Sequence, residues 1–394
     1  MEYDARTYRL AKPGRTGPIA AVLAVIGLAL CVVGYFVDRT QLFHSWLTSF
    51  VFWLTIALGG LFFTMLHHLV GARWSTVLRR LAESIMGVLP VMAVLFLPLL
   101  LGLHELYRWS DAETVAADHL LAAKQPFLNT TFFIIRAAGY FVVWIVLARL
   151  LFGLSLRQDA KPDHAQTRRA RIISAPGMIL FALTITFAAF DWLMSLDAHW
   201  YSTIFGVYVF AGGFLAALAF LTLLVMWLRA GGALREVVTV EHYHDLGKLM
   251  FAFVVFWAYM AFSQYFLIWY GNIPEETVWY LHRWEGSWRA VSLLLVFGHF
   301  ALPFFLLFPQ GTKRNPVILT LMALWLLLMH LVDLHWLVLP SLHHHGIHLS
   351  WMDAAAWLGI GGVFVALLWR RLTRHPLVPV GDPALPDSIN FINP

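Results

Sequence analysis

The sequence predicts an all-α integral membrane protein with ten transmembrane helices. Hydrophobic residues make up 60% of the 394 residues and charged residues only 12%, and the mean hydropathy is +0.72. The apolar residues form ten continuous stretches, each near the length of about 20 residues that a helix needs to cross a bilayer. Because a backbone in lipid must satisfy its own hydrogen bonds, continuous rather than alternating apolar runs indicate helices.

The spans divide the chain into one polytopic membrane domain, residues 1–394, with a polar segment before the first span (1–16) and a polar tail after the last (370–394). The third span contains Pro90 and Pro98, which predict a kink or a tilt because proline lacks the amide hydrogen of a helix interior. In chain order we place the spans at residues 17–37, 47–69, 86–103, 131–153, 172–190, 206–228, 249–270, 289–308, 316–339 and 351–369.

Lysine and arginine are distributed unequally between the two sides of this topology. Of the 27, 20 lie in the N-terminal segment, in the second, fourth, sixth and eighth loops, and in the C-terminal tail. Five lie in the opposite loops, and Arg136 and Arg149 lie inside spans. The positive-inside rule therefore predicts that both termini are cytoplasmic. Anionic lipid headgroups suffice as partners for the basic loops, so the formal net charge of +5 does not call for nucleic acid.

Several classes of cofactor chemistry are excluded within this chain. Cys31 is the only cysteine, whereas iron–sulfur clusters need several thiolates and covalent haem needs a CxxCH motif. We also find no Walker A motif and no dinucleotide-binding glycine pattern. A redox centre would have to be a mobile quinone (menaquinone or ubiquinone), a non-covalent haem, or a group in a partner chain.

The 18 histidines leave two metal hypotheses to weigh. His299 and His330 lie on neighbouring spans at similar depth, which is compatible with a b-type haem, but hydrogen bonding between helices or a proton relay is the favoured interpretation. The last outer loop holds a histidine cluster without suitably spaced carboxylates, so we interpret it as solvated and expect no metal site. Its members are His343, His344, His345 and His348.

The first candidate site lies near the outer ends of the early spans. Arg136 and Asp191 lie at one level on successive spans, so a hairpin predicts an ion pair between them. His44, His104 and His199 are expected at similar depth. Quinol oxidation needs hydrogen-bond partners for two ring oxygens and a group that accepts protons. We therefore predict a quinone site from these five residues; the alternative is a structural salt bridge.

A second set of polar residues lies in the later spans. His330 and Asp333 are three residues apart and share a helix face. With Gln264, His299 and Asp353, they are expected to form a proton path from the middle of the membrane to its outer surface. The alternative is polar contacts that hold packed helices together.

Charged residues near the inner surface have a simpler interpretation. His67, His68 and Glu83 are candidates to continue a proton path inward. We favour instead an ion pair of Glu83 with Arg79 or Arg80 on the same helical turn.

Three long patterns resemble a known family over essentially the whole chain. They are FDWLMSLDAHWYSTIFGVYVFAGGF at Phe190–Phe214, FSQYFLIWYGNIPEETVWYLHR at Phe262–Arg283, and GARWSTVLRRLAE at Gly71–Glu83. The chain resembles the ActF-type membrane subunits, the second quinone-binding-type subunits of bacterial alternative complex III, a quinol:cytochrome c oxidoreductase. More broadly, it is similar to the NrfD-like membrane anchors of polysulfide reductases.

The resemblance implies an architecture and a set of partners. It implies four-helix bundles from helices 2–5 (47–190) and 6–9 (206–339), flanked by helices 1 and 10, in the bacterial inner membrane. The implied partners are a homologous quinol-binding membrane subunit, a periplasmic iron–sulfur subunit, and multihaem and monohaem cytochrome c subunits. The subunit would be non-catalytic or quinone-binding. The rival hypothesis is a scaffold that anchors lipid and partners; a stand-alone transporter is disfavoured because no broken helix pair repeats in two halves.

Overall fold

The computed structural model describes residues 7–10 and 14–393. The rest of the predicted cytoplasmic segment, including Arg6 and Lys12, lies outside the described residues. Ten helices of the described part are long and apolar enough to span a membrane, which confirms the predicted number and a multi-pass membrane protein. All regular structure in this part of the chain is helical.

Eight of the described spans are single helices of 22 to 32 residues, and the other two are short helices in series. They are α1 (Thr16–Val37), α2 (Arg39–Val70), α3 (Thr76–Met86) with α4 (Leu89–Leu101), α8 (Thr130–Ala160), α9 (His164–Trp192), α10 (Phe205–Ala230), α11 (Val240–Gly271), α13 (Trp288–Leu294) with η3 (Leu295–Ala301) and α14 (Leu302–Leu307), α16 (Pro316–Val338) and α17 (Trp351–Arg374).

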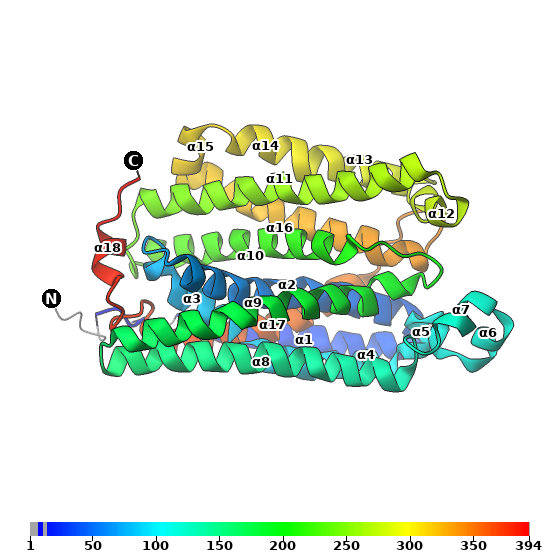
Figure 1. Ribbon diagram of the computed structural model, residues 1–394, viewed down its shortest axis with the longest axis horizontal. Coiled ribbons are helices and arrows are strands. Elements are labelled where there is room, and N and C mark those ends of the chain that lie inside the picture. The colour runs from blue at the N-terminus through cyan, green and yellow to red at the C-terminus, as the bar shows by residue number, and fades with distance from the viewer. Residues whose placement is uncertain (1–6, 11–13, 394) are drawn as a thin grey trace.

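Short helices occupy the connections between the spans. They are α5 (Leu103–Leu106), α6 (Ala112–Ala117), α7 (His119–Lys124), α12 (Pro274–His282), α15 (Gln310–Arg314), α18 (Leu385–Ile389), and the 3₁₀ turns Arg108–Ser110, Met194–Leu196 and Leu339–Ser341. In Figure 1, α5, α6, α7 and α12 lie at one end of the bundle, which we call the loop end. α15 and α18 lie at the other, which we call the terminal end.

Several helices extend beyond the predicted spans. α2 begins at Arg39 rather than at residue 47, because Asp38 caps it by accepting a hydrogen bond from the backbone N–H of Gln41. His44, expected just before this span, therefore lies inside α2 and is buried. α11 likewise begins at Val240, where Thr239 forms a capping box. An apolar-run criterion misses such polar first turns because capping, not hydropathy, decides where a helix begins.

The third span is interrupted just before Pro90, whereas Pro98 lies inside the continuous helix α4. It begins as α3 and resumes as α4 after Gly87 and Val88, with Pro90 in the first turn of α4. Every residue of α3 is buried despite its charges. The predicted pairing of Glu83 is confirmed: it lies 3.0 Å from Arg80 and 3.5 Å from Arg79. Asp382 binds Arg79 and Asp159 binds Arg80, so both buried arginines have carboxylate partners inside the protein.

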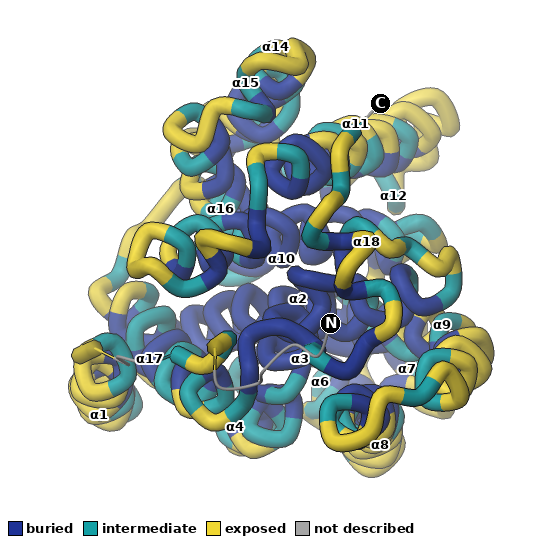
Figure 2. The backbone as a smooth tube through the Cα atoms, turned by 90° about the vertical axis from the view of Figure 1, so that its left-hand side faces the viewer, coloured by how far each residue is buried: buried dark blue, intermediate teal, exposed yellow. Residues whose placement is uncertain are grey.

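α2 and α10 form the centre of the molecule. They pack against each other, and both also contact α9 and α16. α2 further contacts α3, α4 and α17, and α10 contacts α11. Figure 2 shows both central helices almost wholly buried, whereas α1, α8 and α14 at the periphery carry exposed surface. Much of that exposed surface is large and apolar, such as Val25, Phe36 and Val142. Lipid is the natural neighbour of such side chains.

Glycines let the two central helices approach closely. A Cβ atom on Gly59 of α2 would lie 2.1 Å from the Cβ of Ala217, and one on Gly213 of α10 would lie 2.8 Å from the Cβ of Thr55. Thr55 and Gly59 are four residues apart on α2, and Gly213 and Ala217 are four residues apart on α10. This spacing of small residues is typical of close helix contacts in membranes. This contact fixes the distance between α2 and α10.

The residues after α17 form a strap across the terminal end. Asp382 binds Arg79, and the Ser388 hydroxyl donates a 2.5 Å hydrogen bond to the Trp74 carbonyl. Further along, the Asn393 side chain donates to Glu241 at the start of α11. The predicted polar tail 370–394 is therefore docked along its described part, on helices from both halves of the chain.

The α2–α10 contact generates a prediction about stability. Gly59→Ala places a methyl group where the Ala217 side chain already lies, so we expect overpacking to destabilise the protein by about 1–3 kcal/mol. The measurement is the thermal unfolding midpoint in detergent. Gly139→Ala in α8, where a Cβ would meet nothing within 4 Å, is the control and should leave the midpoint unchanged. Equal midpoints for both variants would contradict the close contact.

Candidate functional site

The predicted ion pair between Arg136 and Asp191 is confirmed. Arg136 on α8 donates from Nε to Oδ2 of Asp191 at 2.9 Å and from Nη2 to Oδ1 at 2.7 Å. Asp191 on α9 is fully buried, and the Tyr140 hydroxyl donates a third hydrogen bond of 2.7 Å to Oδ2. The carboxylate therefore has a donor on each oxygen and a formal charge partner, which offsets much of its desolvation.

The surroundings of this pair are filled rather than open. Arg136 also donates to the Phe127 carbonyl at 2.8 Å, and its guanidinium lies 3.9 Å from the Phe127 ring centroid. Beside Asp191, the indole of Trp192 contacts the rings of Phe96 and Phe141, with centroids 4.9 and 5.8 Å away. Aromatic packing and a saturated carboxylate are typical of a structural ion pair, which was the alternative interpretation of this site.

The three histidines predicted to surround the pair have other partners. The His44 ring nitrogen Nδ1 bonds the Thr40 carbonyl one turn earlier at 2.8 Å. The His104 ring bonds Ser110 at 3.1 Å. His199 lies 2.6 Å from Asp118, on a half-exposed surface. The predicted five residues thus do not form one hydrogen-bonded set in the described structure. Depth along the membrane placed them at one level but gave no information about their position around the bundle.

His199 does line a cavity at the loop end, with a volume of about 410 Å³. Trp200 and Trp279 also line it and stack with centroids 4.3 Å apart and planes at 11°. Arg283 is buried in its wall and donates to the carbonyls of Trp336 and Leu337, at 3.1 and 2.9 Å. Burial lowers the pKa of Arg283 to about 9, although nearby Asp197 opposes the lowering.

A separate group of polar side chains lies deep between α2, α10, α11, η3 and α16. We call it the mid-helix cluster; its members are Thr55, Tyr208, Trp257, His299, His330 and Asp333. The Asp333 carboxylate accepts hydrogen bonds from the Tyr208 hydroxyl and, at 3.1 Å, from the Trp257 indole N–H. Three of its members, His299, His330 and Asp333, belong to the predicted proton path.

His330 connects the cluster to the central helix α2. Its Nε2 lies 3.0 Å from the Thr55 hydroxyl, whereas its Nδ1 is buried and has no partner in the described structure. A Cβ on Gly212 would lie 3.4 Å from that Nδ1 and 3.5 Å from Oδ2 of Asp333. The imidazole and the carboxylate therefore face the same spot beside Gly212, which confirms that they share a helix face.

His299 is held on a π-helical turn, η3. The Leu302 N–H donates to the Phe297 carbonyl, so the carbonyl of Gly298 is released and accepts from the Trp325 indole at 2.7 Å. Pro303 offers no N–H to the next carbonyl, which favours this local widening. The His299 ring stacks on Trp257 with centroids 3.9 Å apart. Neither of its buried ring nitrogens has a partner in the part of the chain that the structure describes.

The remaining two members of the predicted path lie apart from the mid-helix cluster. Gln264 accepts from Ser202 at 3.0 Å and donates to Tyr280 at 3.1 Å. Asp353 caps α17, because it accepts from the Ser350 backbone N–H at 2.9 Å and also from Ser45 at 2.6 Å. The predicted proton path is thus split between separate places. Asp353 has a capping role, which its position near the start of a predicted helix could have indicated.

Arg283 lies close to both the mid-helix cluster and the cavity at the loop end. It lines the cavity and interacts electrostatically with Asp197, Tyr208 and Tyr280. Tyr208, Trp257 and Tyr280 were missed in the sequence because only ionisable residues at membrane depth and Gln264 were considered. Aromatic residues are too common here, at 15%, for their polar atoms to stand out.

The histidines of the last outer loop have different contact partners. His343 lies 2.7 Å from the Gln41 side chain and stacks on His348 with centroids 4.8 Å apart. His344 instead contacts the ring of His282. The described residues contain no group of three or more histidine, cysteine or acidic side chains that could hold a metal ion.

The Arg136–Asp191 pair generates the second prediction. Arg136→Ala or Asp191→Ala leaves one buried charge without its partner, so each should destabilise the protein by about 3 to 5 kcal/mol. The double variant Arg136→Leu with Asp191→Leu removes both charges and should recover most of that loss. The measurement is chemical or thermal unfolding in detergent. A double variant at least as unstable as both single variants would argue against a mainly structural pair.

No family model and no curated protein sequence matches the chain. What can be stated of its function therefore comes from the buried polar groups and from the sequence motifs.

Proposed function

We propose that this protein is a membrane subunit of a quinol:cytochrome c oxidoreductase of the alternative complex III type, and that it conducts protons through the mid-helix cluster. One observation carries the second part: a carboxyl group and two imidazoles with three unpartnered ring nitrogens are buried together between the spans. Unsatisfied polar atoms are expensive in a membrane interior, so they are retained mainly where water or protons use them.

The geometry supports a proton route from the mid-helix cluster toward the loop end. His330 and Asp333 face one spot beside Gly212, where a single water molecule could exchange a proton between them. The Tyr208 hydroxyl, bonded to Asp333, continues the route toward Arg283 and the cavity that His199 and Asp197 line. In the proposed orientation the terminal end is cytoplasmic, as the positive-inside rule predicts, so this cavity opens to the periplasm.

The partners follow from the sequence motifs at Phe190–Phe214 and Phe262–Arg283. We assign quinol oxidation, of menaquinol or ubiquinol, to the homologous membrane subunit next to the iron–sulfur protein, with cytochromes c as acceptors. The saturated Arg136–Asp191 pair supports this assignment, because a carboxylate with three donors is poorly placed to accept a quinol proton. Helix contacts within α2–α9 and within α10–α16 are compatible with the two-bundle arrangement. The proposed location is the bacterial inner membrane.

The rival function is a scaffold that anchors lipid and partner subunits without moving protons. The paired charges around Glu83 and Asp191 favour the scaffold, because their role in stabilising the fold requires no proton transfer. The two functions differ in what the mid-helix cluster does once the complex is assembled.

Asp333→Asn distinguishes the two functions. It preserves the shape of the side chain but removes its exchangeable acid, so proton translocation per electron, or the turnover itself, should fall about tenfold or more. The measurement is quinol:cytochrome c turnover and proton release by the purified complex in liposomes, normalised to assembled complex. Asp387→Asn, at the exposed terminal end, is the matched control. Unchanged turnover and proton release per assembled Asp333→Asn complex would support the scaffold.

A further inference from the structure

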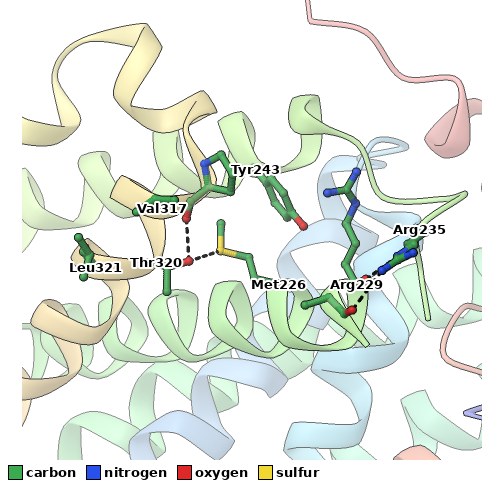
Figure 3. Close-up of a pocket in the computed structure, with 9 residues that line it drawn as sticks. Met226, Arg229, Arg235, Tyr243, Val317, Thr320 and Leu321 are labelled. Atoms are coloured by element: carbon green, nitrogen blue, oxygen red, sulfur yellow. Dashed lines mark hydrogen bonds between the residues drawn. The ribbon is translucent and has the colours of Figure 1, made fainter. Parts of the chain in front are cut away.

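A second cavity opens at the terminal end, on the opposite side of the membrane from the cavity around His199. It has a volume of about 550 Å³ and lies between the end of α10 and the starts of α11 and α16. Its lining is divided by chemistry. Met226, Val317 and Leu321 contribute apolar surface, and Arg229 and Arg235 contribute positive charge. Figure 3 shows the two arginines on one side of the cavity and Leu321 on the other.

The charge in this cavity is not balanced locally. None of the described lining residues is acidic. The two carboxylates near the start of α11 are paired with other cations: Glu241 lies 2.8 Å from Arg314, and Asp245 is paired with Lys248. The Nε of Arg229 is buried and lacks a hydrogen-bond partner in the described structure. A negatively charged ligand would complete this arrangement.

The two arginines are presented in a fixed way. Arg235 donates from Nε to the Arg229 carbonyl and from Nη2 to the Ala230 carbonyl, both at 3.3 Å, and so binds the free carbonyls at the end of α10. The Arg229 guanidinium lies 5.7 Å from the Tyr243 ring centroid, and the Tyr243 hydroxyl points toward it (Figure 3). Donors on both arginines remain for a ligand, since each guanidinium carries five.

The depth of the cavity matches the lipid headgroup region. Trp227, two residues before Arg229, is exposed and packs on Trp369 with centroids 4.7 Å apart. Exposed tryptophans at span ends mark the membrane–water interface. Val317 and Leu321 are 66% and 57% exposed and run from this level toward the middle of the membrane along α16. An acyl chain would follow the same surface.

We propose that this cavity binds one anionic phospholipid, with its phosphate between Arg229 and Arg235 and an acyl chain along Val317 and Leu321. The site takes a phosphodiester carrying net negative charge. A zwitterionic lipid offers the same phosphate but adds a cation beside two arginines. The proposal does not depend on the proposed proton path.

The test uses the full chain in detergent and measures lipid binding by native mass spectrometry. Phosphatidylglycerol should bind more tightly than phosphatidylcholine with the same acyl chains, and Arg229→Gln should weaken phosphatidylglycerol binding about fivefold. Arg169→Gln, an exposed arginine of α9 at the same end, is the matched control and should bind like the wild type.

Three results would overturn the proposal. Equal binding of the two lipids would mean an ordinary annular lipid, and an equal loss in Arg169→Gln would mean unspecific surface charge. Competition by millimolar inorganic phosphate, with no need for acyl chains, would mean a free phosphate site. If Arg229→Gln fails to fold, the wild type is cross-linked with a photoactivatable phosphatidylglycerol. Adducts must then map to residues 226–243 and 316–321, and adducts elsewhere would reject the site.

Discussion

The cost of an unpaired charge in the membrane interior is the constraint on which this structure depends. Arg136 and Asp191 meet in a bidentate pair, and Arg79 and Arg80 are paired with Glu83, Asp159 and Asp382. The pairs that involve Asp191, Asp159 and Asp382 join elements that are separate in the chain, so satisfying these charges also fixes the packing. α3 illustrates the consequence: a helix that is charged in sequence is wholly buried in the fold.

The mid-helix cluster departs from that rule, and the departure is what makes it a candidate site. In the described part of the chain, Asp333 is hydrogen-bonded but makes no ion pair, and His299 and His330 keep unpartnered ring nitrogens. The π-helical turn adds a second irregularity at His299, where a regular helix would bond the Gly298 carbonyl within its own backbone. Local departures from satisfied polar groups and regular helices tend to collect at functional positions.

The two cavities lie at opposite ends of the spans and differ in their surroundings. The cavity at the loop end borders buried Arg283 and stacked tryptophans, and Arg283 interacts electrostatically with Tyr208, which donates to Asp333. The cavity at the terminal end has an apolar and a cationic part and lies between α10, α11 and α16. The two cavities are thus separated along the length of the spans.

The sequence by itself determined the ten spans, the break in the third, the Arg136–Asp191 pair and the pairing of Glu83, because hydropathy, proline and helix periodicity act over short stretches or single hairpins. Only the tertiary structure decided which polar residues at one depth meet. His44, His104 and His199 share a level with Asp191 yet bind elsewhere, and Tyr208 and Trp257 reach Asp333 from other helices. Depth follows from position along a span. The neighbours around the bundle follow from how each helix is rotated and packed, which depends on contacts between residues far apart in the chain.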